Sequence, residues 1–265
     1  MPELKIAIET LSLRQPFKKA LQTAAQLGAA AVEIDVRNEL RVEEFSQTAL
    51  RQLRKMLEDL NLNVSAVTFP TRGGYDESRD LDRRLAATRS AMKFAYDVGA
   101  RVVVNQIGQV PDDPPDSQGD FPQGDLLIES LTNLSDYGQR VGAFFAARTG
   151  NGSAEHLARL IDHLPEESLG VSLDPRALIV QSESPQDAIS ILGRRILHVH
   201  ANDAVRDLSL SRAIEVTLGR GSVDFPALLG ALEEFNYRGW FTIERHDGDD
   251  PIGEIGDAVK YLHSL

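Results

Sequence analysis

The sequence predicts an α/β protein that folds as a single (β/α)8 TIM barrel over residues 1–265. Short apolar segments alternate with longer amphipathic segments eight times, and near-continuous apolar runs are typical of parallel strands that are buried on both faces. No change of composition divides the eight units into separate parts. Because such barrels routinely form one domain of about 250 residues, one barrel accounts for the 265 residues of the chain.

The first four units are bounded by residues that end helices or strands. Gly28 and Gly99 follow the first and third amphipathic segments, where glycine readily takes the left-handed conformation that closes a helix. Leucines at three- and four-residue steps predict a long second helix, and Pro70 closes the third strand. In chain order the expected elements are strand Lys5–Thr10, helix Phe17–Leu27, strand Ala30–Asp35, helix Val42–Leu60, strand Val64–Phe69, helix Asp80–Val98 and strand Arg101–Ile107.

The last four units follow a stretch rich in proline and aspartate, Gly108–Gln123, which we expect to be a surface loop. Ser153 is a good N-cap for the fifth helix, and a serine–proline pair at 184–185 places proline at the first position of the next one. A second long polar loop is expected over residues 204–224. The elements are helix Asp125–Val141, strand Ala143–Arg148, helix Ser153–His163, strand Gly170–Asp174, helix Ser184–Gly193, strand Ile196–His200, helix Phe225–Phe235, strand Trp240–Arg245 and helix Ile252–Leu262.

Composition and charge exclude several classes of partner. The net charge of −12 argues against binding to a nucleic-acid backbone, which needs a basic surface, and favours a small-molecule ligand. The chain has no cysteine, which excludes disulfides and a thiolate nucleophile. Neither a signal peptide nor a run of about 18 apolar residues is seen, so we expect a cytoplasmic protein with no membrane partner.

Polar side chains follow three consecutive strands at the point where each strand ends. Asp174, His200 and Glu244 close the sixth, seventh and eighth strands, and the carboxyl ends of barrel strands meet at one mouth, where such folds carry out chemistry. His198 projects to the same face as His200, because side chains alternate along a strand. Carboxylate and imidazole ligands suit Mn²⁺, Mg²⁺, Co²⁺ or Zn²⁺. Asp174, His200 and Glu244 are therefore candidate metal ligands.

A doubly wound sheet is the alternative to a barrel. It normally carries a glycine-rich phosphate-binding loop after its first strand, whereas the corresponding segment here, Leu11–Pro16, has no glycine. A G-x-G sequence at 219–221 lies far along the chain and is weak evidence by itself. The barrel therefore remains the better prediction.

Four segments together resemble the xylose isomerase-like TIM barrels, the superfamily of sugar and sugar-phosphate isomerases and epimerases that includes the ketose 3-epimerases. The segments are GVSLDP at 170–175, HVHANDAVR at 198–206, LGRGSVDFPALLGAL at 218–232 and YRGWFTIER at 237–245. The resemblance implies proton transfer next to a carbonyl at a divalent-metal site, with a small sugar or sugar phosphate as substrate.

The resemblance also implies roles for individual residues. In the ketose 3-epimerases, one divalent metal is bound by Glu, Asp, His and Glu at the ends of strands five to eight, and the two glutamates are the acid/base pair. By motif, Asp174, His200 and Glu244 match the last three ligands, which also makes Glu244 a catalytic residue. Arg206, six residues after His200, matches an arginine that holds substrate oxygens.

The fifth strand departs from the family pattern. Related strands often end in L-A-x-E-T-G, and the corresponding segment here reads AARTG at 146–150. Arg148 therefore stands where the first metal-binding glutamate is expected. A guanidinium is always protonated and cannot ligate a metal, so the change removes a negative ligand and a base and adds a positive charge. We expect metal binding to be weak or lost.

Three interpretations stay open, and with them whether the chain is an active enzyme. In the first, it is a sugar isomerase or epimerase in which Glu244 abstracts a proton, a metal polarises the carbonyl, and Glu9 or Glu33 replaces the missing glutamate. In the second, Arg148 pairs with Asp174 or Glu244 and fills the metal position. The barrel would then bind an anionic or sugar-like ligand with impaired catalysis.

In the third interpretation, Arg148 belongs to an anion site. Arg72 after the third strand, and Arg206 and Arg220 after the seventh, would join it in binding a phosphate or carboxylate of the substrate. Arg72, Arg148 and Arg206 are therefore candidate substrate-binding residues, and a homo-oligomer also stays open. In every interpretation we expect the four residues that end strands five to eight to lie around one mouth, within about 10 Å of each other.

Overall fold

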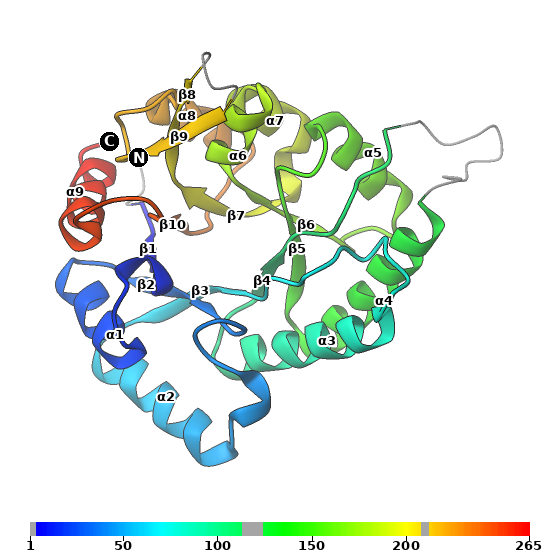
Figure 1. Cartoon of the computed structure of the whole chain (residues 1–265), viewed down its shortest axis with the longest axis horizontal. Coiled ribbons are helices and arrows are strands. Elements are labelled where there is room, and N and C mark those ends of the chain that lie inside the picture. The colour runs from blue at the N-terminus through cyan, green and yellow to red at the C-terminus, as the bar shows by residue number, and fades with distance from the viewer. Residues whose placement is uncertain (1–3, 113–123, 208–211) are drawn as a thin grey trace.

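Eight parallel strands close into a barrel, and the helices form a ring around it (Figure 1). The computed structural model describes residues 4–112, 124–207 and 212–265, so most of the expected proline-rich loop lies outside the described residues. Around the barrel the strands follow the order β1-β2-β3-β4-β5-β6-β7-β10. The predicted TIM barrel is therefore confirmed. Its strands are β1 (Ile6–Glu9), β2 (Ala31–Asp35), β3 (Asn63–Thr68), β4 (Val102–Asn105), β5 (Phe144–Arg148), β6 (Gly170–Leu173), β7 (Ile196–Ala201) and β10 (Phe241–Ile243).

Each barrel strand leads into helical segments that cover the outside of the barrel. Two of them begin at the predicted serine caps: Ser153 accepts a hydrogen bond from the N–H of His156, and Ser184 from the N–H of Asp187, both at 3.2 Å. None of the described helices is long and apolar enough to cross a membrane. The helices are η1 (Leu11–Leu13), α1 (Phe17–Gln26), η2 (Val42–Glu44), α2 (Gln47–Asp59), α3 (Leu81–Asp97), α4 (Asp125–Val141), α5 (Ala154–His163), α6 (Pro175–Gln181), α7 (Pro185–Leu192), η3 (Gly193–Arg195), α8 (Phe225–Glu234) and α9 (Pro251–His263).

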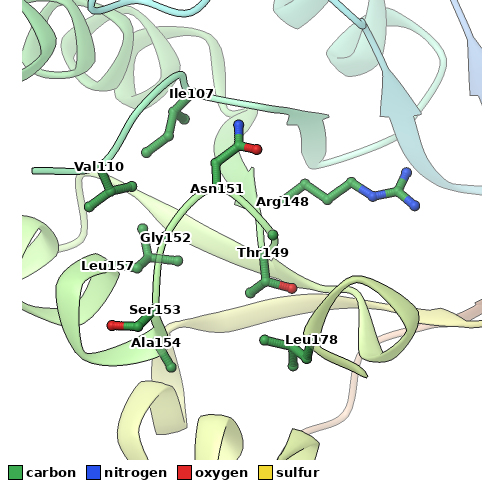
Figure 2. A pocket seen from close by; sticks show the side chains of 11 residues that line it. Ile107, Val110, Arg148, Thr149, Asn151, Gly152, Ser153, Ala154, Leu157 and Leu178 are labelled. Atoms are coloured by element: carbon green, nitrogen blue, oxygen red, sulfur yellow. The ribbon is translucent and has the colours of Figure 1, made fainter. Parts of the chain in front are cut away.

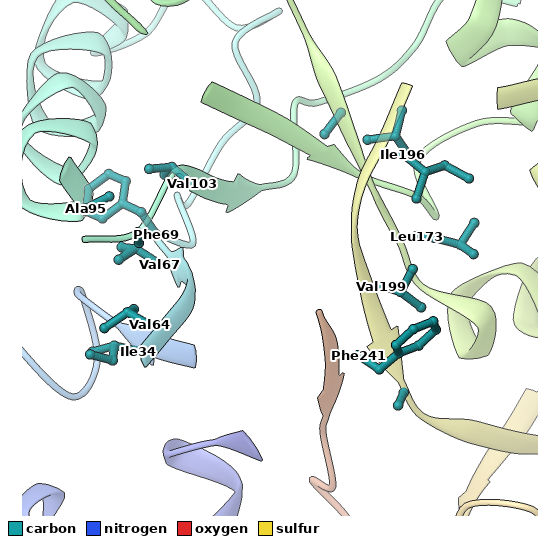
Figure 3. Close-up of a cluster of buried hydrophobic side chains, with 14 of the residues drawn as sticks. Ile34, Val64, Val67, Phe69, Ala95, Val103, Leu173, Ile196, Val199 and Phe241 are labelled. Carbon is teal, nitrogen blue, oxygen red and sulfur yellow. The ribbon is translucent and has the colours of Figure 1, made fainter. Parts of the chain in front are cut away.

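The main hydrophobic core lies between the barrel and the helices. Figure 3 shows Val67 of β3 and Val103 of β4 beside Ala95 of α3, and all three are fully buried. Since side chains alternate along a strand, the other set points into the barrel. That set is partly polar: Ser65 of β3 and Thr242 of β10 lie within 3.2 Å although two strands separate them in the sheet. The barrel interior therefore holds hydrogen-bonding side chains.

Three segments differ from the sequence prediction. Helix α2 begins at Gln47 rather than Val42, because Ser46 caps it by accepting a hydrogen bond from the N–H of Ala49 at 3.2 Å. The expected polar loop after β7 contains an antiparallel hairpin, β8 (Asp203–Asp207) and β9 (Arg212–Val216). Helix α6 was not expected. It starts directly after Asp174, whose carboxylate accepts a hydrogen bond from the N–H of Ala177 at 3.0 Å.

The G-x-G sequence at 219–221 closes the base of this hairpin. The N–H groups of Gly219 and Gly221 donate to Oδ2 of the buried Asp203 at 3.1 and 2.8 Å. A Cβ atom at position 221 would lie 2.1 Å from Oδ1 of Asp203. Glycine is therefore needed for the close approach of the backbone to this carboxylate, which gives the motif a structural explanation.

Two helical glycines make the packing of the outer ring testable. A Cβ on Gly138 of α4 would lie 2.6 Å from the backbone oxygen of Ala143, whereas a Cβ on Gly230 of α8 would meet nothing within 4 Å. Gly138→Ala should lower the free energy of unfolding by roughly 1–3 kcal/mol through overpacking. Gly230→Ala should raise it by about 0.5–1 kcal/mol, because alanine favours the helix. Urea denaturation of both variants checks this, and equal effects would contradict the packing described for α4.

Candidate active site

The guanidinium of Arg148 lies between two buried carboxylates at the carboxyl end of the barrel. Its Nε donates to Oδ2 of Asp174 at 2.8 Å, and its Nη2 donates to Oε2 of Glu244 at 2.6 Å. The exposed fractions of the three side chains are 14% for Arg148, 2% for Asp174 and 0% for Glu244. In Figure 2 the Arg148 side chain points away from Ile107 and Leu157, which lie beside the end of β5. Arg148 thus reaches across the mouth from β5 to the end of β10.

The charge of Arg148 keeps both carboxyl groups ionised. Burial alone would raise the pKa of Asp174, but Arg148, together with His200 and Arg176, outweighs burial, and the pKa lies below its usual value. The same balance holds the pKa of Glu244 well below its usual range. Burial would lower the pKa of Arg148, yet the two carboxylates raise it well above the ordinary value. A permanent cation therefore lies between two anions that would otherwise repel each other.

Asn202 forms a second link between the two carboxylates. Its Nδ2 donates to Oδ1 of Asp174 at 2.9 Å and to Oε2 of Glu244 at 2.8 Å. Its Oδ1 accepts a hydrogen bond from the N–H of Arg176 at 3.0 Å. Because Asn202 is itself buried, the carboxylate positions are fixed by a neutral donor as well as by Arg148.

Glu215 of β9 ties the hairpin to this mouth. Its side chain is 2% exposed and pairs with Nη1 of Arg176 at 3.2 Å and Nη1 of Arg245 at 3.5 Å. It also accepts a hydrogen bond from the N–H of His246 at 3.0 Å. Arg176 in turn places its Nη2 3.8 Å from Oε2 of Glu244. Glu215 and Arg176 thus form an outer layer of charge around the bridge that Arg148 makes to Asp174 and Glu244.

His200 is fully buried beside the bridge. Its Nδ1 lies 3.6 Å from Oε2 of Glu244, and neither ring nitrogen has a hydrogen-bond partner among the described residues. Burial, with the nearby charge of Arg148 as the next cause, lowers the pKa of His200 to about 4. The imidazole is therefore neutral at physiological pH and keeps a free lone pair.

His198 forms a layer below His200 together with Glu33 of β2. Its Nε2 lies 3.1 Å from Oε2 of Glu33 and 2.7 Å from Oγ1 of Thr242, and its Nδ1 lies 3.0 Å from Oγ of Ser172. The two histidine rings meet edge to face at 4.7 Å between centroids, as expected for residues on one face of a strand. Burial opposes ionisation of Glu33, but the two histidines outweigh it and lower its pKa to about 2.

Glu9 of β1 and His246 complete the mouth. His246 Nε2 lies 3.1 Å from Oε2 of Glu9 and 3.3 Å from Oε1 of Glu244. The hydrogen bond to Glu9 is the main cause that raises the pKa of His246 to about 9. Burial raises the pKa of Glu9. A second cation, the imidazolium of His246, therefore also faces Glu244.

The expected metal ligands Asp174, His200 and Glu244 do not fit a divalent ion in this arrangement. Arg148 already binds both carboxylates, at the side where a cation would be held. Among the described residues, two other groups have donor atoms within 4.8 Å of one another: the buried group Glu33, His198 and His200, and the group Glu9, Glu244 and His246. The first group could hold a metal ion if His198 gave up its present hydrogen bonds.

Two predicted substrate-binding residues lie away from the bridge. Arg72 is exposed in the segment after β3, and Arg206 is exposed on β8, where it pairs with Ala213. In the parts of the chain that the structure describes, no hydrogen bond or ion pair joins either of them to Arg148. Their role in substrate binding, like those of Arg148, Asp174, His200 and Glu244, stays a prediction.

Comparison with known proteins shows which family the chain belongs to. The family model described as "Xylose isomerase-like TIM barrel" matches residues 21–265. The chain belongs to the xylose isomerase-like TIM barrel family. Among its relatives is the inosose dehydratase of Geobacillus thermodenitrificans (strain NG80-2), with 26% identity over 79% of this chain and 76% of the relative.

Solved structures of the xylose isomerase-like family share the fold. A xylose isomerase domain protein from Planctomyces limnophilus superposes with a TM-score of 0.85 at 24% identity, covering 99% of this chain and 97% of the other. A D-allulose 3-epimerase from Methylomonas sp. in complex with D-allulose superposes with a TM-score of 0.77 at 16% identity, again covering 99% and 97%. The resemblance predicted from the sequence is confirmed at the level of the family.

Three residues of this xylose isomerase-like mouth, Arg176, Glu215 and His246, were not predicted to belong to it. Asn202 is a polar residue that directly follows the seventh strand, two positions after His200, so its place at the mouth agrees with the sequence. Arg176 and His246 each follow a predicted ligand by two residues, but their positions depend on a helix start and a loop that spacing does not define. Glu215 was assigned to a loop, and only the hairpin brings it to the mouth.

The buried, neutral His200 predicts a loss of stability in acid. Its pKa is about 4 when folded, against an ordinary value of 6.5, so unfolding takes up a proton between these values. The free energy of unfolding should therefore fall as the pH falls from about 6.5 to about 4, by at most on the order of 3 kcal/mol. His200→Gln should flatten this dependence, measured by urea denaturation at several pH values.

His263→Gln is the matched control, because His263 is exposed at the end of α9. It should keep the pH dependence of the wild type in the same window. If His200→Gln and the wild type lose stability with the same slope between about pH 6.5 and 4, His200 is not a buried neutral group.

Proposed function

We propose that this chain binds a polyhydroxylated carbonyl compound, such as a ketose or keto-cyclitol, at the barrel mouth, and that Arg148 takes the place of a divalent ion between Asp174 and Glu244. The observation that carries the proposal is the pair of contacts from Arg148 to these carboxylates, at 2.8 and 2.6 Å. Two relatives support the ligand class, since one is named for inosose and the other is described with D-allulose.

The donors left over at the mouth suit such a ligand. Nη1 of Arg148 makes no hydrogen bond to the described residues, and the side chain keeps 14% of its surface exposed. A guanidinium N–H directed at a carbonyl oxygen would stabilise negative charge that develops there. The imidazolium of His246, 41% exposed, offers a second cationic donor on the opposite side of Glu244.

Proton abstraction should be weak in this arrangement. Glu244 is the base that the family resemblance implies, but Arg148, His200 and His246 all favour its ionised form and hold its pKa well below the usual range. A carboxylate with a strongly lowered pKa is a poor proton acceptor. We therefore infer a ligand-binding barrel with slow or no turnover of free ketoses.

A second candidate is the metal-dependent sugar isomerase or epimerase implied by the family resemblance. It is supported by His200 and by Oε1 of Glu244, which are buried without hydrogen-bond partners among the described residues, as metal-binding groups often are before the ion is added. In that case Arg148 has to leave both carboxylates, and a metal would supply the polarisation of a substrate carbonyl. The two candidates differ in whether Mn²⁺ and Arg148 compete for the same site.

Isothermal titration with Mn²⁺ separates the two candidates. Wild-type protein freed of metal with EDTA should bind Mn²⁺ weakly or not at all, and Arg148→Glu should bind it at least about a thousandfold more tightly. The reason is that two unit charges about 4 Å apart interact by roughly 4 kcal/mol at an effective dielectric constant near 20. D-allulose should still bind to the EDTA-treated wild type.

Arg101→Glu is the matched control, because it makes the same change of charge at an exposed residue beside the amino end of β4. It should leave Mn²⁺ binding unchanged. Micromolar Mn²⁺ binding by the wild type that Arg148→Glu does not alter would overturn the proposal and favour the metal-dependent isomerase.

A further inference from the structure

A cleft lined by arginines lies beside the barrel mouth, between the segments that follow β2 and β3. Its volume is about 590 Å³, which is within the usual range for small-molecule sites, roughly 300–1,000 Å³. Phe69 and Val36 contribute apolar surface, and the start of α3 closes one side. The charged residues that line it are Arg37, Arg41, Glu43, Arg72, Asp80, Arg83 and Arg84.

The charge of this cleft is opposite to that of the whole chain. Five guanidiniums and two carboxylates line it, although the protein carries a formal net charge of −12. Like charges that converge on one cleft repel each other unless an anion or a solvent shell separates them. Arg41 is already paired with Glu44 at 3.3 Å, but the remaining excess of arginine in an acidic protein makes this cleft a candidate site for an anionic ligand.

The arginines differ in how far they are already engaged. Arg84 donates to backbone oxygens of Glu77 and Arg79 at 3.1 and 2.9 Å, which holds it in place. Arg37 packs over the ring of Phe69 at 5.7 Å.

Arg72 and Arg83 form no hydrogen bond or ion pair within the described residues. Both are exposed and both line the cleft. Their donors are therefore available to a ligand, next to a guanidinium that is already positioned.

We propose that this cleft binds the phosphate of a phosphorylated small molecule. A phosphate offers three terminal oxygens, and guanidiniums bind such groups through paired, charge-assisted hydrogen bonds. Arg72 and Arg83 are the main contacts, with Arg84 held behind them. The site lies at the same end of the barrel as the Arg148 bridge but uses none of its residues. Phosphate binding here therefore does not depend on whether a metal binds between Asp174 and Glu244.

The probes are inorganic pyrophosphate and inorganic phosphate, titrated by calorimetry at low ionic strength. Wild-type protein should bind pyrophosphate saturably, more tightly than phosphate, and with an affinity that falls as salt is added. Arg72→Ala and Arg83→Ala should each weaken binding by roughly tenfold, since each removes one charged contact. Circular dichroism checks that both variants remain folded.

Two controls make the test specific to the cleft. Arg79→Ala removes an exposed arginine of the same segment that lies 3.7 Å from Asp80 and does not line the cleft, and it should leave pyrophosphate binding unchanged. Arg101→Ala, at an exposed residue beside the amino end of β4, should also leave it unchanged. Absence of saturable binding, equal affinity in all four variants, or loss of binding in Arg101→Ala alone would each overturn the proposal.

Discussion

The bridge from Arg148 to Asp174 and Glu244 is the interaction on which the mouth of this barrel depends. Two carboxylates that are almost completely buried cannot both stay ionised without a cation between them. The guanidinium supplies that charge from within the chain, and Asn202 donates to the other oxygen of Asp174 and to the same Oε2 of Glu244 that Arg148 contacts. The neutral state of His200 follows from its burial and, next, from the nearby charge of Arg148.

The bridge also separates this chain from what its family resemblance implies. A divalent ion would need the carboxylate oxygens that Arg148 now occupies, and a guanidinium cannot be displaced by losing its proton. The same residues that would build a metal site therefore build an internal ion pair. The buried group of Glu33, His198 and His200 includes a histidine, His198, that Ser172 and Thr242 hold in place.

Strand alternation and the apolar runs were enough to predict the barrel and the position of its mouth. Asp174, His200 and Glu244 converge because each lies at the end of a parallel strand. Arg148 contacts both carboxylates, as expected for a cation at the position where relatives carry a metal-binding glutamate. Glu215 could not be predicted, because it reaches the mouth only through the β8–β9 hairpin, and the polar sequence of this segment was interpreted as a loop without strands. Arg72 was expected at the mouth, but it lines a separate cleft. The position of a residue along a loop does not fix the direction in which its side chain points.

The most direct measurement of the bridge is a double-mutant cycle of stability with Arg148→Met and Asp174→Asn. Removing one partner of a buried pair costs about 3–5 kcal/mol, so Arg148→Met alone should be strongly destabilising. Asp174→Asn keeps the helix cap and removes the carboxylate charge that Arg148→Met leaves without a partner. It should therefore recover stability in the Arg148→Met background, although it destabilises the wild type. A coupling energy of about 2 kcal/mol or more is predicted. Additive effects within about 0.5 kcal/mol would contradict a bridge that holds the mouth together.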